Sequence, residues 1–100
     1  MKEYYLIIDG KKIATEKTFD VINPAIGTAF AQAPDCSITQ LNLAVEAAHR
    51  AFQSWRLNEP ARRKALLACA DILRSSAEEL GKILTEEQGK TFQQAKGECE

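Results

Sequence analysis

The 100-residue sequence lacks the features that mark several special classes of protein. Lys and Arg together number 13 against 14 Asp and Glu, so the formal charge is -1. A chain without excess positive charge has little with which to neutralise phosphates, which argues against nucleic acid as a partner. The apolar run Tyr4–Ile8 is too short for a secretory core or a membrane span. We therefore expect no membrane partner and a cytoplasmic location.

The three cysteines lack the spacing of a disulfide framework or of a zinc site. Cys36, Cys69 and Cys99 are an odd number at wide intervals, without a Cys-x-x-Cys pair. This pattern favours neither a disulfide framework nor a zinc site. Cys36 directly precedes a predicted helix start, where a thiolate is stabilised, but no base stands beside it. We expect Cys36 to be structural or simply exposed, and Cys69 to be a packing residue.

The short chemical signatures of common enzymes are absent. The sequence contains no G-x-G-x-x-G, G-x-x-x-x-G-K-[ST], H-E-x-x-H or G-x-S-x-G. His49, the one histidine, falls on the polar side of a predicted helix and is expected to be solvated. A basic group at residues 62–64 is interpreted as a solvated face, with a carboxylate from another segment as the alternative partner. We predict no catalytic and no cofactor-binding residue in this segment.

The first third of the chain has the pattern of strands. Tyr4–Ile8 is aromatic and β-branched, Asp9-Gly10 is a strong two-residue hairpin turn, and the chain returns over residues 11–14. A second hairpin is predicted over residues 18–33. Its turn runs from Asn23 to Gly27, where Pro24 presets φ and glycine tolerates the left-handed conformation.

After residue 35 the apolar period changes from two to about 3.6, which predicts helices. Three pairs fit a capping box, in which two side chains satisfy free backbone donors of the first turn: Ser37 with Gln40, Ser76 with Glu79, and Thr91 with Gln94. An apolar, alanine-rich stripe runs from Leu41 to Trp55 and is expected to pack closely against another segment. Further stripes follow, with their apolar members at Leu66, Cys69, Ala70 and Leu73, and at Leu80, Ile83 and Leu84.

These patterns predict an α+β segment with two N-terminal β-hairpins over residues 1–35, followed by three to four α-helices over residues 36–100. The last helical pattern reaches Glu100 after about two turns, without a cap or a breaker. We therefore expect this segment to belong to a longer chain.

Several stretches resemble, in order, the start of the aldehyde dehydrogenase superfamily. They are Ile8–Lys11 (I-[ND]-G-K), Phe19–Ala25 with Gly27 (F-x-V-x-N-P-A-T-G), Ala44–Trp55 (A-V-x-A-A-x-x-A-F-x-x-W), Arg62–Leu73, Glu79-Leu80, and Glu87–Lys90 with Ala95 and Gly97-Glu98 (E-x-G-K-x-x-x-x-A-x-G-E). Ile26 stands where threonine is usual in that family. The order and spacing of the matches cover nearly the whole chain.

The resemblance implies an NAD(P)-dependent enzyme that oxidises an aldehyde to a carboxylic acid through a cysteine thioester. Residues 1–100 would form the N-terminal portion of the cofactor-binding domain of an α/β Rossmann-type fold. The catalytic and oligomerisation domains would lie outside this segment, and NAD or NADP would be bound mainly by downstream residues. None of the three cysteines here matches the family's G-Q-x-C nucleophile motif.

The resemblance also implies the partners of the segment. They are the remainder of the same polypeptide, an aldehyde substrate, and further copies in a homodimer or homotetramer. Some relatives hold a monovalent cation near the Asn-Pro turn, for which Ile22 and Glu98 are the matching residues. A different interpretation of the same apolar stripes is a self-contained helical protein-interaction module without catalysis.

Overall fold

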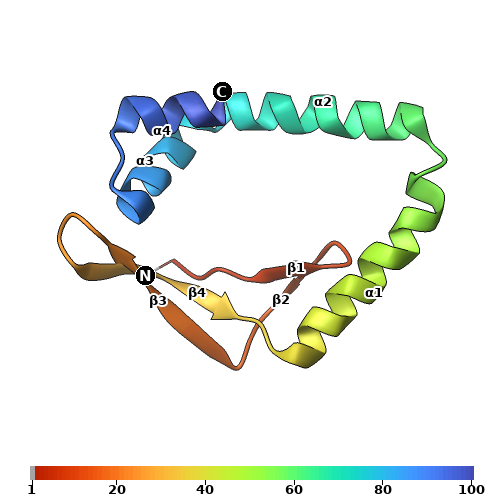
Figure 1. Ribbon diagram of the computed structural model, residues 1–100, viewed down its shortest axis with the longest axis horizontal. Coiled ribbons are helices and arrows are strands. Elements are labelled where there is room, and N and C mark those ends of the chain that lie inside the picture. Colours follow the sequence, from red (N-terminus) through yellow and green to blue (C-terminus); the bar gives the residue numbers. More distant parts are fainter. Residues whose placement is uncertain (1) are drawn as a thin grey trace. The chain divides into compact units, whose positions relative to one another are not determined.

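The computed structural model describes residues 2–100, which form two small antiparallel sheets followed by four helices (Figure 1). The elements are β1 (Leu6–Ile8), β2 (Lys11–Ile13), β3 (Lys17–Asn23), β4 (Thr28–Asp35), α1 (Ile38–Trp55), α2 (Glu59–Ser75), α3 (Ala77–Gln88) and α4 (Phe92–Cys99). The sheets pair β1 with β2 and β3 with β4. The predicted α+β class, with two hairpins before the helices, is confirmed.

The first hairpin turns at the two predicted residues. Asp9 and Gly10 both have positive φ, 53° and 73°, as a two-residue turn of this twist requires. Ile8 lies opposite Lys11 in the register of the pair. The strands are shorter than predicted, since β1 begins at Leu6 and β2 ends at Ile13. After β2, the Thr15 hydroxyl donates to the carbonyl of Lys17 at 2.5 Å.

The second hairpin is held at its turn by one asparagine. The carbonyl of Asn23 accepts the N–H groups of Ile26 at 3.3 Å and Gly27 at 2.8 Å. Its side-chain Oδ1 accepts the N–H of Ala25 at 2.9 Å. Gly27 has φ 70°, a value that side chains disfavour. The turn chemistry predicted from the sequence is therefore present.

The return strand of this hairpin, β4, extends two residues beyond the predicted end at Ala33. The Gln32 amide donates across the hairpin to Asp20 at 3.1 Å, which adds a side-chain link between β3 and β4. Pro34 lies inside β4. A two-stranded sheet tolerates a proline because each strand has one edge that needs no partner.

Helix α1 begins with the predicted capping box. The Ser37 hydroxyl accepts the Gln40 N–H at 3.1 Å, and Gln40 Oε1 accepts the Ser37 N–H at 3.1 Å. The amide of Gln40 also donates to the carbonyl of Ala14 at 2.9 Å, beyond the end of β2. One side chain thus caps the helix and joins it to the segment after the first hairpin.

Helix α3 begins without the second predicted capping box. Ser76 has φ -104° and ψ 4°, its side chain makes no capping bond, and its N–H donates to the carbonyl of Ile72 at 3.0 Å. A capping box needs an extended residue whose N–H is available to the acidic side chain. Ser76 instead continues the hydrogen bonding of α2, so the box predicted with Glu79 is wrong. The predicted restart near this position is confirmed, because α2 ends at Ser75.

Helices α3 and α4 pack against each other through small residues. A Cβ added at Gly81 would lie 3.1 Å from the backbone N and Cα of Lys96, and 3.2 Å from the ring of Phe92. Ala77 and Ala95 are 2% and 0% exposed. The helix backbones approach this closely only because no larger side chain separates them.

A left-handed glycine ends α3. Gly89 has φ 76°, and its N–H donates to the carbonyl of Thr85 at 2.8 Å. Thr91 then caps α4 by accepting the Gln94 N–H at 3.3 Å, which is the forward half of the third predicted box. A Cβ at Gly89 would lie 3.1 Å from Cγ of Pro24, so the turn of the second hairpin contacts the junction between α3 and α4.

The chain divides into two compact units that do not follow the division between strands and helices. One unit joins the chain up to Val21 with Ala31–Glu59, and the other joins Ile22–Phe30 with Pro60–Glu100. The turn of the second hairpin thus belongs with α2, α3 and α4. Among the described residues, the buried apolar side chains are all alanines: Ala31, Ala47, Ala77 and Ala95.

The contact at Gly81 predicts opposite effects for two glycine substitutions within helices. Gly81→Ala forces a methyl group against the α4 backbone and should lower the free energy of unfolding by about 1–3 kcal/mol. Gly97→Ala is the matched control, since its Cβ would meet nothing within 4 Å, and it should raise that free energy by about 0.5–1 kcal/mol. Urea unfolding of the full-length protein measures both. Equal effects would contradict the close approach.

The two serine positions make a second pair of predictions. Ser37→Ala removes a formed cap and should cost about 1 kcal/mol of stability. Ser76→Ala removes a side chain that caps nothing and should change stability by less than about 0.5 kcal/mol. Thermal unfolding of the two variants compares them directly, and a larger loss for Ser76→Ala would mean that its hydroxyl has a capping role after all.

Candidate functional site

The three cysteines lie in different surroundings. Cys36 is exposed just before the cap of α1, and its Sγ donates to the carbonyl of Ser37 at 3.4 Å. Cys69 is exposed on α2, and Cys99 is half-buried in α4. The exposure of Cys69 corrects the expectation that it is a packing residue. Its neighbours on the same stripe, Leu66 and Leu73, are also 69% and 46% exposed, so this stripe of α2 is not covered by the described chain.

His49 is solvated, as predicted. Its ring Nε2 lies 3.5 Å from the amide of Gln53, one turn along α1, and the same amide donates to the His49 carbonyl at 3.4 Å. Within residues 2–100, no group of three or more His, Cys, Asp or Glu side chains is placed to hold a metal ion. Arg63 and Lys64 are exposed at the start of α2 and Arg62 is half-buried. No nucleophile, base and orienting group come together in these elements.

The ionisable group with a perturbed pKa lies at the N-terminal side of the first hairpin. The Tyr5 hydroxyl donates to the carboxylate of Glu3 at 2.6 Å. This hydrogen bond, with the repulsion between the carboxylate and a phenolate, raises the pKa of Tyr5. The tyrosine is exposed, and the raised pKa makes its hydroxyl a weaker acid that stays protonated near neutral pH. It is therefore no candidate for proton transfer.

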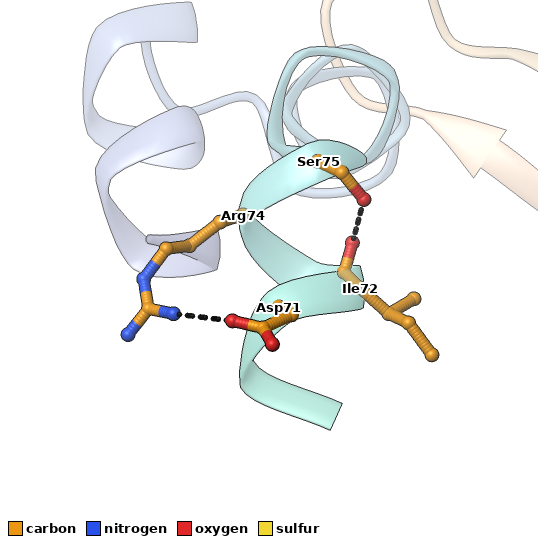
Figure 2. A network of polar contacts seen from close by, with 4 residues as sticks. All are labelled: Asp71, Ile72, Arg74 and Ser75. Atoms are coloured by element: carbon orange, nitrogen blue, oxygen red, sulfur yellow. Dashed lines mark hydrogen bonds and ion pairs between the residues drawn. The ribbon is translucent and has the colours of Figure 1, made fainter. Parts of the chain in front are cut away.

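Large apolar faces are the most prominent surface feature of the helices. On α1 the predicted stripe is exposed, with Val45 at 60% and Phe52 at 52%, while the residue buried in this helix is Ala47. Helix α2 has no buried residue among those described. Figure 2 shows the Ile72 side chain projecting away from the helix, while Arg74 bonds to Asp71 at 3.2 Å on another side. Exposed apolar area of this kind is typical of a surface that another polypeptide covers.

The residues implied as cation ligands lie in the same compact unit. Ile22 is in β3 beside the Asn23 turn, and Glu98 is in the last turn of α4. An isoleucine can offer a cation only its backbone carbonyl, whereas glutamate offers a carboxylate, and both are oxygen ligands of the hard type that alkali ions accept. The donor types therefore fit such an ion.

The structure adds a residue that the sequence did not indicate. Lys90 Nζ lies 2.5 Å from Glu98 Oε1, with 24% of the lysine side chain and 55% of the glutamate side chain exposed. The two residues are eight positions apart on either side of the α4 cap, a spacing outside the usual helical pairs. In the sequence, Gly89-Lys90 was noted only within the E-x-G-K stretch of the resemblance, without a role for the lysine.

No helix among the described residues is long and apolar enough to cross a membrane.

A protein-family model described as the aldehyde dehydrogenase family matches residues 12–100. The aspartate-semialdehyde dehydrogenase (non-phosphorylating) of Halomonas elongata is 39% identical over 99 residues, which cover 96% of this chain and 20% of that protein. The mitochondrial succinate-semialdehyde dehydrogenase of Rattus norvegicus is 36% identical over 92 residues, which cover 91% of this chain and 18% of the relative.

Solved structures give the same result. A betaine aldehyde dehydrogenase from Staphylococcus aureus, a point mutant in complex with NAD+, superposes with a TM-score of 0.86 at 27% identity, over 95% of this chain and 20% of that one. The chain thus spans about a fifth of the length of the relatives that it matches.

Proposed function

The chain belongs to the aldehyde dehydrogenase family, and from this membership we propose that it is part of an NAD(P)-dependent enzyme that oxidises an aldehyde to a carboxylic acid. The observation that carries the proposal is the family match over residues 12–100. A relative at 39% identity and a solved structure with a TM-score of 0.86 support it. The self-contained interaction module is not favoured, because the same residues match enzymes along the whole segment.

In this enzyme the segment acts as scaffold. A cysteine thiolate outside residues 2–100 would add to the aldehyde carbon and form a thiohemiacetal, and loss of a hydride from that carbon would give the thioester that water then hydrolyses. The nicotinamide cofactor, NAD or NADP, supplies the hydride acceptor when bound. The groups described here have no arrangement for any of these steps. Their contribution is to fold the hairpins and helices that the rest of the cofactor-binding domain rests on.

The exposed apolar faces support the remainder of the same polypeptide as the partner. Val45 and Phe52 on α1 and Leu66 on α2 are each more than half exposed. Burying such side chains contributes about 1.5–3 kcal/mol each. The segment is accordingly the N-terminal portion of the cofactor-binding domain, while the catalytic and oligomerisation domains lie elsewhere in the enzyme. We further propose that the enzyme forms a homodimer or homotetramer and lies in the cytoplasm. The rat relative, by contrast, is mitochondrial by its name.

A monovalent cation site at Ile22 and Glu98 is part of the same proposal. Their oxygen donors suit an alkali ion, and both belong to the unit that contains Ile22–Phe30 and Pro60–Glu100. Pro24 and Gly89, which lie in contact, connect the strand end of Ile22 with the helical side of this unit. The ion would stabilise the junction without entering the chemistry.

The proposed activity is tested with the full-length protein. Succinate semialdehyde and betaine aldehyde, each with NAD+ and with NADP+, are supplied and the absorbance of the reduced nicotinamide is followed. We expect oxidation of at least one aldehyde, with acid as the product and a covalent thioester trapped by acid quenching. A full-length protein that lacks a G-Q-x-C cysteine and reduces neither cofactor would contradict the proposal.

The scaffold role makes a separate prediction for the three cysteines. The triple variant Cys36→Ala, Cys69→Ala and Cys99→Ala should keep kcat within about threefold of the wild-type value, because no reacting thiol is removed. Alanine at the G-Q-x-C cysteine of the full-length chain is the control and should abolish turnover. Loss of thioester formation in the triple variant, with an unchanged melting temperature, would place the nucleophile in this segment instead.

A further inference from the structure

The turn of the first hairpin contains the only Asp-Gly pair in the sequence. The other aspartates, Asp20, Asp35 and Asp71, precede valine, cysteine and isoleucine. The Asp9 side chain is 68% exposed, and a Cβ added at Gly10 would meet nothing within 4 Å. No neighbouring part of the described chain therefore shields the Asp9 carboxyl or crowds residue 10.

An aspartate that precedes glycine can close a five-membered ring with the main chain. The Gly10 nitrogen adds to Cγ of the protonated Asp9 carboxyl, a C–N bond forms, and the carboxyl hydroxyl leaves with the amide hydrogen as one water molecule. Water then opens the succinimide. Attack at the main-chain carbonyl carbon of Asp9 breaks its bond to the Gly10 nitrogen, so the chain now runs through Cβ and Cγ as isoaspartate. The two steps release and consume one water, and glycine favours them because it has no side chain to hinder its nitrogen.

The closed turn holds Asp9 out of the geometry that this ring requires. In the ring, Cβ, Cα and the main-chain carbonyl carbon of Asp9 lie nearly in one plane with the Gly10 nitrogen. Asp9 has φ 53°, the one positive value outside glycine among residues 2–100, and a left-handed residue has ψ of about +30 to +60°. For an L-residue, this ψ places Cβ on the opposite side of the Cα–C bond from that nitrogen. The turn must therefore open before the ring can close.

Few interactions keep this turn closed. The strands on either side have three residues each, and Ile8 lies opposite Lys11 next to the turn. A two-stranded hairpin is only marginally stable on its own. Helix α1 adds an ion pair, with Arg50 Nη2 3.9 Å from Asp9 Oδ2. This pair joins the reacting carboxyl group itself to the helix, so it opposes both the opening of the turn and the approach of Cγ to the Gly10 nitrogen.

We propose that Asp9 is a modification site, where the chain forms isoaspartate through a succinimide with Gly10 when the hairpin opens, and that Arg50 slows this reaction. The product has one more main-chain carbon at a turn that two residues otherwise make, so it no longer fits the register of Ile8 with Lys11. Its free carboxylate is attached directly to Cα. That group is the substrate of a carboxyl methyltransferase that uses S-adenosylmethionine. The inference does not depend on the proposed enzymatic activity.

Ageing of the full-length protein at neutral pH tests the proposal. Isoaspartate is measured by methylation with an isoaspartyl methyltransferase and radiolabelled S-adenosylmethionine, and it is located by fragmentation of peptides in the mass spectrometer. We expect it at Asp9 and not at the other aspartates. Arg50→Gln should speed its formation about twofold, the effect of losing an exposed ion pair. Arg74→Gln breaks the exposed 3.2 Å pair with Asp71, and as the matched control it should leave the rate at Asp9 unchanged.

Two substitutions of Asp9 and a reference peptide complete the test. Asp9→Asn keeps a residue that adopts the left-handed conformation, and it should form the same succinimide with loss of ammonia and gain mass as its amide becomes a carboxyl group. Asp9→Glu would need a six-membered ring and should form no product. A peptide of residues 4–14 lacks α1 and should react faster than the protein.

Two results would count against the proposal. Absence of isoaspartate from Asp9 in both the aged wild type and Arg50→Gln would overturn the modification site. Equal rates in the wild type, Arg50→Gln and the peptide would overturn the protection by the closed turn and by Arg50.

Discussion

Close approach of two helix backbones through small residues holds α3 and α4 together. Gly81 has no Cβ, and a Cβ added there would lie only 3.1 Å from the backbone of Lys96 on α4. The buried apolar side chains among the described residues are alanines. Backbones that approach in this way gain many weak dispersion contacts. They gain little from transfer of apolar area out of water, because a methyl group is small. The packing therefore fixes geometry more effectively than it supplies stability.

The scarcity of large buried side chains explains why the apolar stripes of α1 and α2 matter. A buried leucine or phenylalanine contributes about 1.5–3 kcal/mol, against about 0.8 kcal/mol for one methylene-sized group. Phe52 and Leu66 remain more than half exposed, so most of the stabilisation available from this composition is not realised within the described residues. A surface with so much exposed apolar area is best suited to being covered by the rest of a larger fold. The family membership identifies that fold.

Local chemistry made the turns and two of the caps predictable from sequence. Asp9-Gly10 and the Asn23 turn depend on φ preferences and on hydrogen bonds within a few residues, and the Ser37 cap depends on residues three positions apart. The Ser76 prediction failed because capping also requires the preceding helix to have ended. There the carbonyl of Ile72 still accepts the Ser76 N–H. A four-residue motif from Ser76 to Glu79 does not include Ile72, so it cannot show that the Ser76 N–H is already bonded to α2.

Position in the fold, rather than residue type, decided the remaining features. Cys69 lies on an apolar stripe, and the period correctly places it on that side of α2, but the period does not say whether the stripe is covered. Lys90 and Glu98 are eight residues apart, and the lysine lies directly after the left-handed Gly89 that ends α3. An ion pair made across a helix boundary depends on that boundary's backbone geometry. The Lys90–Glu98 pair is thus a property of the α3–α4 junction as a whole, which neither residue reveals alone.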